Sequence, residues 1–223
     1  MKKNEVLQKV GSALEQYLGV SKPQASGLLS PNAGEGKLYE AYILGIIARE
    51  LTTREGCTLV LRNSNSLTLK SGGGGINRVY PRVDVFRGGE LLGELWTDIE
   101  FTTLSYAKVG GQIMPCHYHE LDIVLVPPLS NGKPPAADLI FAVECKNVSI
   151  YDKSLLREIL GIRRELSLLT APPMPTVFTA WPRAVVPADP PSCLVVYSTN
   201  AAVVAYKAVG DVFGIDFFHE PII

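Results

Sequence analysis

One short apolar segment of the sequence carries two opposite charges at a spacing that suits metal-assisted chemistry. Residues 141–147 read Phe-Ala-Val-Glu-Cys-Lys-Asn, which places Glu144 and Lys146 two positions apart. In a β-strand, side chains two positions apart share a face. An unpaired charge is costly to bury, so each of these groups needs a partner. A bound metal ion is a suitable partner for the carboxylate, and the carboxylate is a suitable partner for the ammonium group.

A second segment of the same kind precedes it. Residues 118–126 are also expected to form a strand, in which Glu120 and Asp122 share one face. The proline-rich stretch between the two segments contains Asn131-Gly132, a strong signal for a hairpin turn. Antiparallel pairing of the two strands would therefore bring Asp122 beside the charged pair of the later strand.

This order of residues resembles the motif of the PD-(D/E)xK nuclease superfamily, in which an aspartate precedes a Glu-x-Lys on the neighbouring strand. Here the motif reads Asp122, then Glu144-Cys145-Lys146, with Leu121 where the family has proline. The resemblance implies that Asp122, Glu144 and the backbone carbonyl of Cys145 bind Mg²⁺, with Mn²⁺ as an alternative. It also implies that Lys146 orients or activates the attacking water, and that an acidic residue on the preceding helix often joins the site.

Glu40 is the candidate for that helix residue. It lies in a predicted helix over residues 36–51, whose apolar side chains cover nearly the whole circumference, so the helix should be buried. One interpretation is a carboxylate favoured by the dipole at a helix N-terminus. The other, which the resemblance favours, is a catalytic residue that acts with Asp122, Glu144 and Lys146.

A rival acidic pair occurs in the predicted strand over residues 90–103. Asp98-Ile99-Glu100 offers two carboxylates, but no lysine accompanies them. Alternation would place Glu94, Trp96, Asp98 and Glu100 on one face of the strand. We expect this to be a solvated face of an antiparallel sheet.

A cysteine and two histidines also lie close together, in Cys116-His117-Tyr118-His119. A structural zinc site uses four ligands, commonly in paired spacings, and no second Cys/His pair occurs in this sequence. We therefore expect the two histidines at the mouth of a cleft rather than on zinc. If His119 lies near Asp122, it is a candidate for contacting a phosphate or assisting proton transfer.

A basic stripe follows the Glu-x-Lys motif. Residues 153–170 are predicted to form a helix, and Lys153, Arg157 and Arg164 lie nearly opposite its apolar stripe. No acidic residue lies three or four positions from either arginine, so the helix does not neutralise its own stripe. Phosphate binding and pairing with another element of the fold both remain open. With His119, these three residues form the predicted substrate-binding set.

The composition indicates an ordered globular protein. Of the 223 residues, 47% are apolar and 19% are charged, and the formal net charge is −1. A near-neutral chain has no global basic field, so a nucleic-acid site would have to be a local patch. No apolar run reaches the ~18 residues of a membrane-spanning helix. The four scattered cysteines suit reduced thiols, and hence a cytoplasmic location, better than a disulfide framework.

The expected fold class is α/β, and its order of elements follows the resemblance. Residues 1–35 are predicted to form an N-terminal helix and a connector, and residues 36–223 a single nuclease-like domain. The resemblance covers about residues 36–199 and implies a restriction-endonuclease-like mixed β-sheet flanked by helices, with an αβββαβ core. The remaining predicted elements are strands at 57–62, 79–86, 176–181, 194–199 and 215–219, helices at 5–18 and 201–209, and a glycine-rich loop at 63–75.

These patterns together predict a Mg²⁺-dependent endonuclease that hydrolyses phosphodiester bonds of nucleic acid. The resemblance favours DNA as the substrate, a role in restriction or phage defence, and a homodimer or a partner subunit in a defence complex. Two alternatives remain open: a structure-specific repair or junction nuclease, and a non-catalytic subunit that binds nucleic acid or protein. The intact aspartate, glutamate and lysine favour an enzyme, whereas the near-neutral charge favours a binding subunit.

Overall fold

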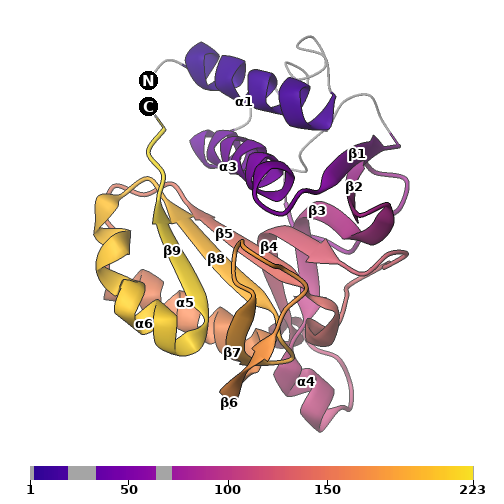
Figure 1. Cartoon of the computed structure of the whole chain (residues 1–223). Coiled ribbons are helices and arrows are strands. Elements are labelled where there is room, and N and C mark those ends of the chain that lie inside the picture. The colour runs from indigo at the N-terminus through magenta and orange to yellow at the C-terminus, as the bar shows by residue number, and fades with distance from the viewer. Residues whose placement is uncertain (1–2, 20–33, 64–71, 223) are drawn as a thin grey trace.

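A seven-stranded mixed β-sheet forms the centre of the molecule (Figure 1). The computed structural model describes residues 3–19, 34–63 and 72–222. The strand order in the sheet is β1-β2-β3-β4-β5-β8-β9, and β6 and β7 form a separate two-stranded sheet. In chain order, the helices and strands are α1 (Lys3–Leu18), α3 (Glu35–Thr53), β1 (Thr58–Arg62), β2 (Arg82–Arg87), β3 (Glu90–Thr102), α4 (Leu104–Val109), β4 (Tyr118–Val126), β5 (Phe141–Lys146), α5 (Lys153–Leu166), β6 (Leu168–Pro175), β7 (Val185–Asp189), β8 (Cys193–Ser198), α6 (Lys207–Phe213) and β9 (Ile215–His219).

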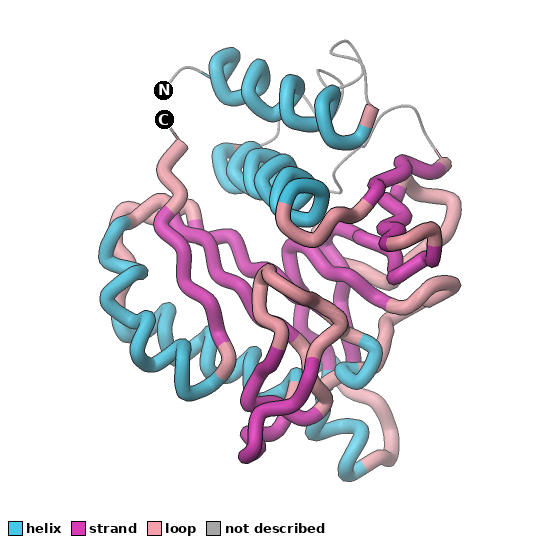
Figure 2. Tube along the Cα trace, in the orientation of Figure 1, coloured by secondary structure: helices cyan, strands magenta, loops and turns pink. Residues whose placement is uncertain are grey.

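The direction of pairing changes once across the large sheet. Strands β1 to β5 pair with their neighbours in antiparallel fashion, as consecutive strands joined by short connections do. Strands β5, β8 and β9 are parallel, and α5 lies in the crossover between β5 and β8. Helices cover both faces of the sheet (Figure 2). The predicted α/β class and the predicted antiparallel hairpin of β4 and β5 are therefore confirmed.

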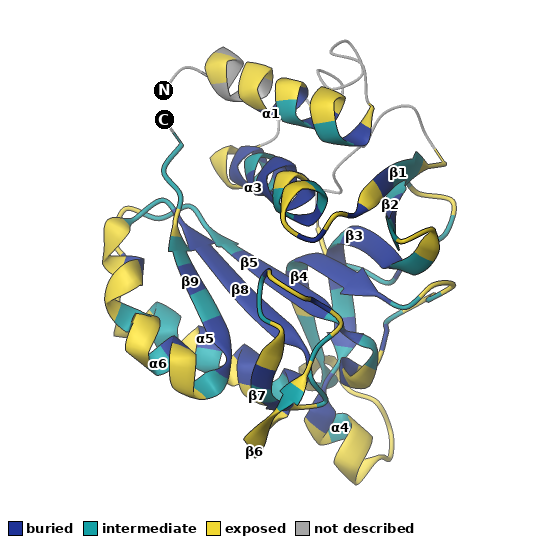
Figure 3. Cartoon of the chain, in the orientation of Figure 1, coloured by how far each residue is buried: buried dark blue, intermediate teal, exposed yellow. Residues whose placement is uncertain are grey.

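Helices α1 and α3 cover one face of the sheet and share a core with it (Figure 3). The predicted amphipathic character of α1 is confirmed, because Val10 and Leu14 are buried against α3. The two helices approach closely at Gly45, where an added Cβ atom would lie 3.0 Å from the Cβ of Ala13. Helix α3 itself is buried along most of its length, as the sequence predicted.

Helix α5 packs on the opposite face, through buried Ile159, Ile162 and Leu166. It ends at Leu166, four residues before the predicted end. Residues 168–175 instead form β6, which includes Pro172 and Pro173, and proline cannot donate the backbone hydrogen bond that a helix interior requires.

The strand predicted at residues 176–181 is wrong, because the structure forms a loop there. The loop is held by the buried carboxylate of Glu55, which accepts hydrogen bonds from the backbone N–H groups of Thr179, Ala180 and Trp181. These N–H groups are thus bound to a side chain and not to a neighbouring strand. Arg87 pairs with the same carboxylate at 2.8 Å and balances its charge.

The helix predicted at 201–209 is divided in two, a 3₁₀ helix at Ala201–Tyr206 followed by α6. Part of the predicted connector, residues 20–33, and part of the predicted glycine-rich loop, residues 64–71, lie outside the described residues. Within the described ranges, no helix combines the length and the apolar composition needed to cross a membrane.

Candidate active site

A cavity of about 650 Å³ lies where β4, β5 and α5 meet. Asp122 lines it from β4, and Glu144 and Lys146 line it from β5, so the three residues of the predicted motif share one cavity. The other lining residues are His119, Glu120, Arg157, Glu158, Gly161, Ile162, Arg164 and Glu165. Of the predicted site residues with a side-chain role, only Glu40 and Lys153 are not part of its wall.

The two motif strands separate at the cavity. Their antiparallel ladder ends at the pair Ile123 and Val143, so the next pair would join Asp122 and Glu144. Instead, Oδ2 of Asp122 accepts a hydrogen bond of 2.6 Å from the backbone N–H of Cys145. The carboxylate takes the place of a main-chain acceptor, and this contact fixes the aspartate at the start of the Glu-x-Lys motif.

Lys146 lies between two carboxylates. Its Nζ is 2.8 Å from Oε2 of Glu144 and 2.8 Å from Oε1 of Glu158 on α5. Burial raises the pKa of Glu144, and the negative charge of Asp122 acts in the same direction. Burial alone would lower the pKa of Lys146, but the two carboxylates outweigh it and raise that pKa. The ammonium group therefore stays charged, in a position fixed by both partners.

A cluster of three carboxylates adjoins this pair. Oxygen atoms of Glu40, Asp98 and Asp122 all lie within 4.8 Å of one another. Asp98 and Asp122 face each other across neighbouring strands, because the pairs on either side of them, from Thr97 to Ile99, are in constant register. Glu40 reaches the same point from α3.

Lys37 partly neutralises the cluster. Its Nζ pairs with Oε2 of Glu40 at 2.7 Å and also with Asp98. Burial would lower the pKa of Lys37, but its hydrogen bonds to Asp98 and Glu40 outweigh burial and raise it. Burial raises the pKa of Glu40 to about 7, and the charge of Asp122 adds to the effect. Burial raises the pKa of Asp122 as well. The ammonium group of Lys37 thus offsets part of the negative charge of the cluster.

The expectation of a solvated face around Asp98 is wrong. Asp98 is fully buried, and Glu94 and Trp96 are almost as inaccessible, at 1% and 2% exposure. Asp98 also belongs to the carboxylate cluster with Glu40 and Asp122, whereas the sequence suggested that it forms a separate acidic pair with Glu100. The lack of a nearby lysine in the sequence was misleading, because Lys37 reaches Asp98 from a different element.

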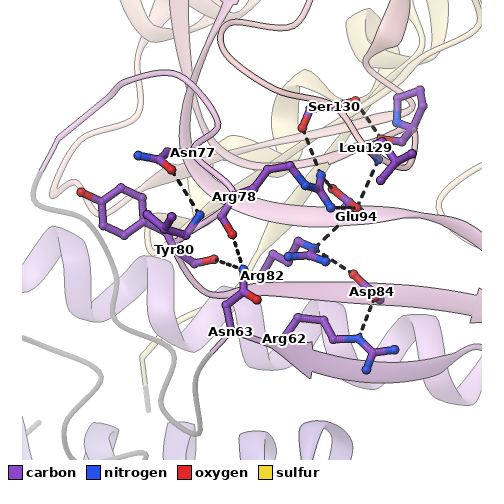
Figure 4. Close-up of polar contacts among 12 residues, drawn as sticks. Arg62, Asn63, Asn77, Arg78, Tyr80, Arg82, Asp84, Glu94, Leu129 and Ser130 are labelled. Atoms are coloured by element: carbon purple, nitrogen blue, oxygen red, sulfur yellow. Dashed lines mark hydrogen bonds and ion pairs between the residues drawn. The ribbon is translucent and has the colours of Figure 1, made fainter.

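Glu94 is buried for a different reason, since arginine side chains surround it (Figure 4). Arg78 donates two hydrogen bonds to its carboxylate, at 2.7 and 2.8 Å, and the backbone N–H of Leu129 donates a third at 3.2 Å. Burial would raise the pKa of Glu94, but these hydrogen bonds lower it. Glu94 is therefore an ionised structural anchor and not a second metal ligand.

The start of α5 lies close in the chain to the end of β5, which brings the basic residues of the helix near the cavity. Asp152 caps the helix by accepting hydrogen bonds from the N–H groups of Ser154 and Leu155, six residues after β5 ends. Arg157 and Arg164 both line the cavity. Lys153 lies one helical turn before Arg157 on the same side of the helix, beyond the cavity wall.

The two histidines have different surroundings. Nδ1 of His117 accepts a hydrogen bond of 3.0 Å from the N–H of Met114, and its ring lies 4.9 Å from that of Tyr106. His119 lines the same cavity as Asp122.

The comparisons with known proteins do not add a relative to this site. No protein-family model matches the chain, and no match was found among curated proteins or among solved structures.

Proposed function

We propose that this protein is a metal-dependent nuclease that hydrolyses phosphodiester bonds, with DNA as the expected substrate. The observation that carries the proposal is the meeting of Asp122, Glu144 and Lys146 in one cavity, next to the carboxylates of Glu40 and Asp98. Several buried charges at one point are costly to a fold, so a binding subunit without chemistry would have no reason to keep them.

The order of elements supports the resemblance to the PD-(D/E)xK superfamily. Helix α3, strands β3, β4 and β5, helix α5 and strand β8 occur along the chain in the αβββαβ order that the resemblance implies, and β8 is parallel to β5. Further elements are inserted in this order: β1 and β2 before β3, α4 before β4, and β6 and β7 before β8. The proposed motif residues lie on β4 and β5, and the helix acid lies on α3. The proposal of a restriction-endonuclease-like core rests on this order and on the motif.

The carboxylate cluster fits a hard divalent cation. Mg²⁺ and Mn²⁺ prefer oxygen ligands, and Glu40, Asp98 and Asp122 offer such atoms close together. Lys37 would have to release Glu40 and Asp98 for the ion to bind. The resemblance proposes a different set of metal ligands, namely Asp122, Glu144 and the Cys145 carbonyl. Asp122 is the ligand that the two sets have in common. When bound, the metal would polarise the scissile phosphate and lower the pKa of a water molecule.

The charge of the cavity is consistent with a need for metal. Five carboxylates line it, against one lysine and two arginines. A polyanion would be repelled from such a surface unless cations were bound there. One bound divalent cation would neutralise this excess of two negative charges and so remove the repulsion of a phosphodiester.

The side chains of the cavity have separate tasks in the proposed reaction. A water oxygen attacks the phosphorus, and the bond from phosphorus to the leaving oxygen breaks, which gives a phosphate monoester and a free hydroxyl. Lys146, held by Glu144 and Glu158, donates hydrogen bonds to the attacking water or to a phosphate oxygen, where negative charge increases. Arg157 and Arg164 bind the neighbouring phosphates.

The wider role is also a proposal. The resemblance favours restriction or phage defence in the cytoplasm, and a homodimer would account for cleavage of both strands. The second candidate is a structure-specific repair or junction nuclease. Helix α5 contributes two arginines to the cavity wall, Arg157 and Arg164. Two arginines suit contact with a few phosphates near the cleavage point.

Cleavage assays on plasmid and single-stranded DNA test the proposal directly. Activity should require Mg²⁺ or Mn²⁺ and disappear in EDTA, and Ca²⁺ should support binding better than cleavage. Glu144→Ala and Lys146→Ala should abolish cleavage with an unchanged circular dichroism spectrum. The matched controls Glu90→Ala and Lys207→Ala change residues outside the cavity wall and should remain active. Full activity in either cavity variant, or undiminished cleavage in EDTA, would contradict the proposed mechanism.

A further inference from the structure

Lys37 already places a cation in the carboxylate cluster, and the proposed reaction gives this residue no step. Its Nζ lies 2.7 Å from Oε2 of Glu40 and also pairs with Asp98, so one ammonium group bridges two of the three clustered carboxylates. The third carboxylate, that of Asp122, is held instead by the backbone N–H of Cys145. The side chain of Lys37 is 22% exposed, so salt screens these ion pairs less than it screens pairs on the surface.

The place of Lys37 in α3 is unfavourable for a lysine by local rules. Lys37 is the third residue of the helix, in the turn that carries the positive end of the helix dipole. That end of a helix stabilises a carboxylate and destabilises a cation. The two ion pairs offset this cost, and they connect the start of α3 to Asp98 on β3.

A bound metal ion would affect Lys37 differently from Lys146. Lys146 pairs with Glu144 and with Glu158, and Glu158 belongs to neither proposed set of metal ligands. Lys146 would therefore keep one carboxylate even if a metal ion bound Glu144. Both carboxylates that pair with Lys37 belong to the cluster, so an ion bound there would take both of them.

We propose that Lys37 is an internal counterion that the divalent cation replaces, and that this residue thereby sets the affinity of the metal site. The inference rests on the proposed function, because it takes the cluster of Glu40, Asp98 and Asp122 as the metal site. Without metal, the ammonium group holds two carboxylates in place against their mutual repulsion. When metal binds, the ammonium group leaves the cluster, because two cations at the same oxygen atoms repel each other. Breaking the two ion pairs then offsets part of the free energy of metal binding.

The first measurement is the Kd of the full chain for Mn²⁺, obtained from the electron paramagnetic resonance signal of the free ion. Lys37→Met removes the charge and places a good helix former in α3. Its Kd should be at least about tenfold lower than that of the unmodified protein, because a neighbouring positive charge no longer opposes the ion. Lys37→Arg keeps the charge and should bind Mn²⁺ no more tightly than the unmodified protein.

The matched control is Lys133→Met. Lys133 has a side chain 32% exposed and pairs at 2.6 Å with Glu100, which is outside the carboxylate cluster. Its replacement removes the same charge from another ion pair and should change the Kd less than about threefold. If Lys37→Met does not fold in the absence of metal, Lys37→Gln is the second uncharged variant, and it retains a hydrogen-bond donor for the carboxylates.

Amine labelling of the unmodified protein tests the release of Lys37 without any substitution. Acetic anhydride acetylates accessible amines, and mass spectrometry of the resulting peptides gives the rate for each lysine. Lys37 should be acetylated at least about threefold faster in saturating Mn²⁺ than in EDTA, because its ammonium group is no longer bound by two carboxylates. Lys153, which is exposed and outside the cavity wall, should be acetylated at the same rate in both conditions.

The outcomes separate this inference from the proposed function. Equal or weaker Mn²⁺ binding by the uncharged variant, or unchanged acetylation of Lys37 in Mn²⁺, would refute the role of Lys37. Metal-dependent cleavage would in that case still support the nuclease, with the ion held by Asp122, Glu144 and the Cys145 carbonyl. No Mn²⁺ binding by either protein, together with cleavage in EDTA, would refute both proposals.

Discussion

Replacing Glu40 with glutamine should make the metal-free protein more stable at pH 8. In the folded protein, burial and the charge of Asp122 raise the pKa of Glu40 from 4.5 to about 7. Because the folded state binds this proton more tightly than the unfolded state, the group costs no stability below pH 4.5. Stability is then lost as the pH rises from 4.5 to about 7, and the loss stays constant above that range. Glutamine carries no charge at any of these pH values, so it avoids the loss.

The size of the effect follows from the pKa difference. A rise from 4.5 to about 7 is about 2.5 units, and each unit is worth about 1.4 kcal/mol, which gives an upper limit of about 3.5 kcal/mol. Solvent near the site screens part of this, and the variant also loses the ion pair of Glu40 with Lys37. We therefore expect a gain of about 1–2 kcal/mol in the free energy of unfolding at pH 8, and a smaller gain at pH 5.

Urea unfolding in EDTA at pH 5 and pH 8 measures this difference. Glu50→Gln is the matched control, because Glu50 lies on the same helix with a side chain 15% exposed, against 12% for Glu40. Glu50 is paired with Arg49 and Arg54, so its replacement should be neutral or destabilising at both pH values. If Glu40→Gln is less stable than the unmodified protein at pH 8, or if its effect does not depend on pH, the ionised carboxylate of Glu40 does not destabilise the folded state and the prediction is wrong.

Three further outcomes are expected. Mn²⁺ at a hundred times its Kd should stabilise the protein by about 2.7 kcal/mol in thermal unfolding. The Asp98→Asn variant should lose most of this stabilisation, because it lacks one of the proposed ligands. The control Glu100→Gln, in which the replaced carboxylate pairs with Lys133, should keep the stabilisation. The double variant Arg157→Gln/Arg164→Gln should bind all DNA sequences more weakly and reduce the slope of log K against log salt by about 0.9 for each lost duplex contact; an unchanged slope with lower stability would make these arginines structural. Glu55→Gln should lower the free energy of unfolding by about 2–4 kcal/mol in urea, because a buried charge-assisted network is broken, and a loss below about 1 kcal/mol would contradict the role given to that loop anchor.

The motif residues could be placed from the sequence because their positions depend on short-range rules. The alternation of apolar residues predicts β4 and β5, and a turn signal between them predicts antiparallel pairing. Once the two strands pair, Asp122 must lie beside Glu144, and the short connection to α5 brings Arg157 to the same cavity. Glu40 was harder to place, because only the resemblance indicated that α3 crosses the sheet at this point.

The burial of Arg163 and the loop at 176–181 depend on contacts between distant parts of the chain. Glu55 contacts Trp181 across more than a hundred residues, and no local pattern predicts that a glutamate replaces a strand partner there. The sequence pattern likewise does not distinguish Arg163 from the other charged residues of α5. Its guanidinium group is bound by the carbonyls of Phe213 at the end of α6 and of Ser192 just before β8, contacts that the sequence pattern does not specify.

The position of Asp98 was missed because β3 does not keep its alternation. Leu95, before Asp98, packs in the core cluster with α1 and α3, whereas Ile99, after it, packs in the cluster with α5. Odd-numbered residues therefore change sides between these two positions. Asp98 lies within this change and has φ of +54°, a backbone conformation that residues other than glycine rarely adopt. The sequence rule assumes a regular pleat, so it placed Asp98 with Glu94, on the wrong face.

The same change occurs in the neighbouring strand, at Asp122. Ile123 packs in the cluster with α3, and Leu121 packs in the cluster with α5, so β4 changes sides directly opposite β3. Two adjacent strands thus break their pattern at the same pair of aspartates, which turns both carboxylates toward Glu40 instead of placing them in an apolar layer. A left-handed backbone costs of order 1–3 kcal/mol and persists only where the surrounding structure enforces it. The strain lies at the point where the proposed metal would bind, and this coincidence is the structural reason to regard the aspartate pair as the centre of the site.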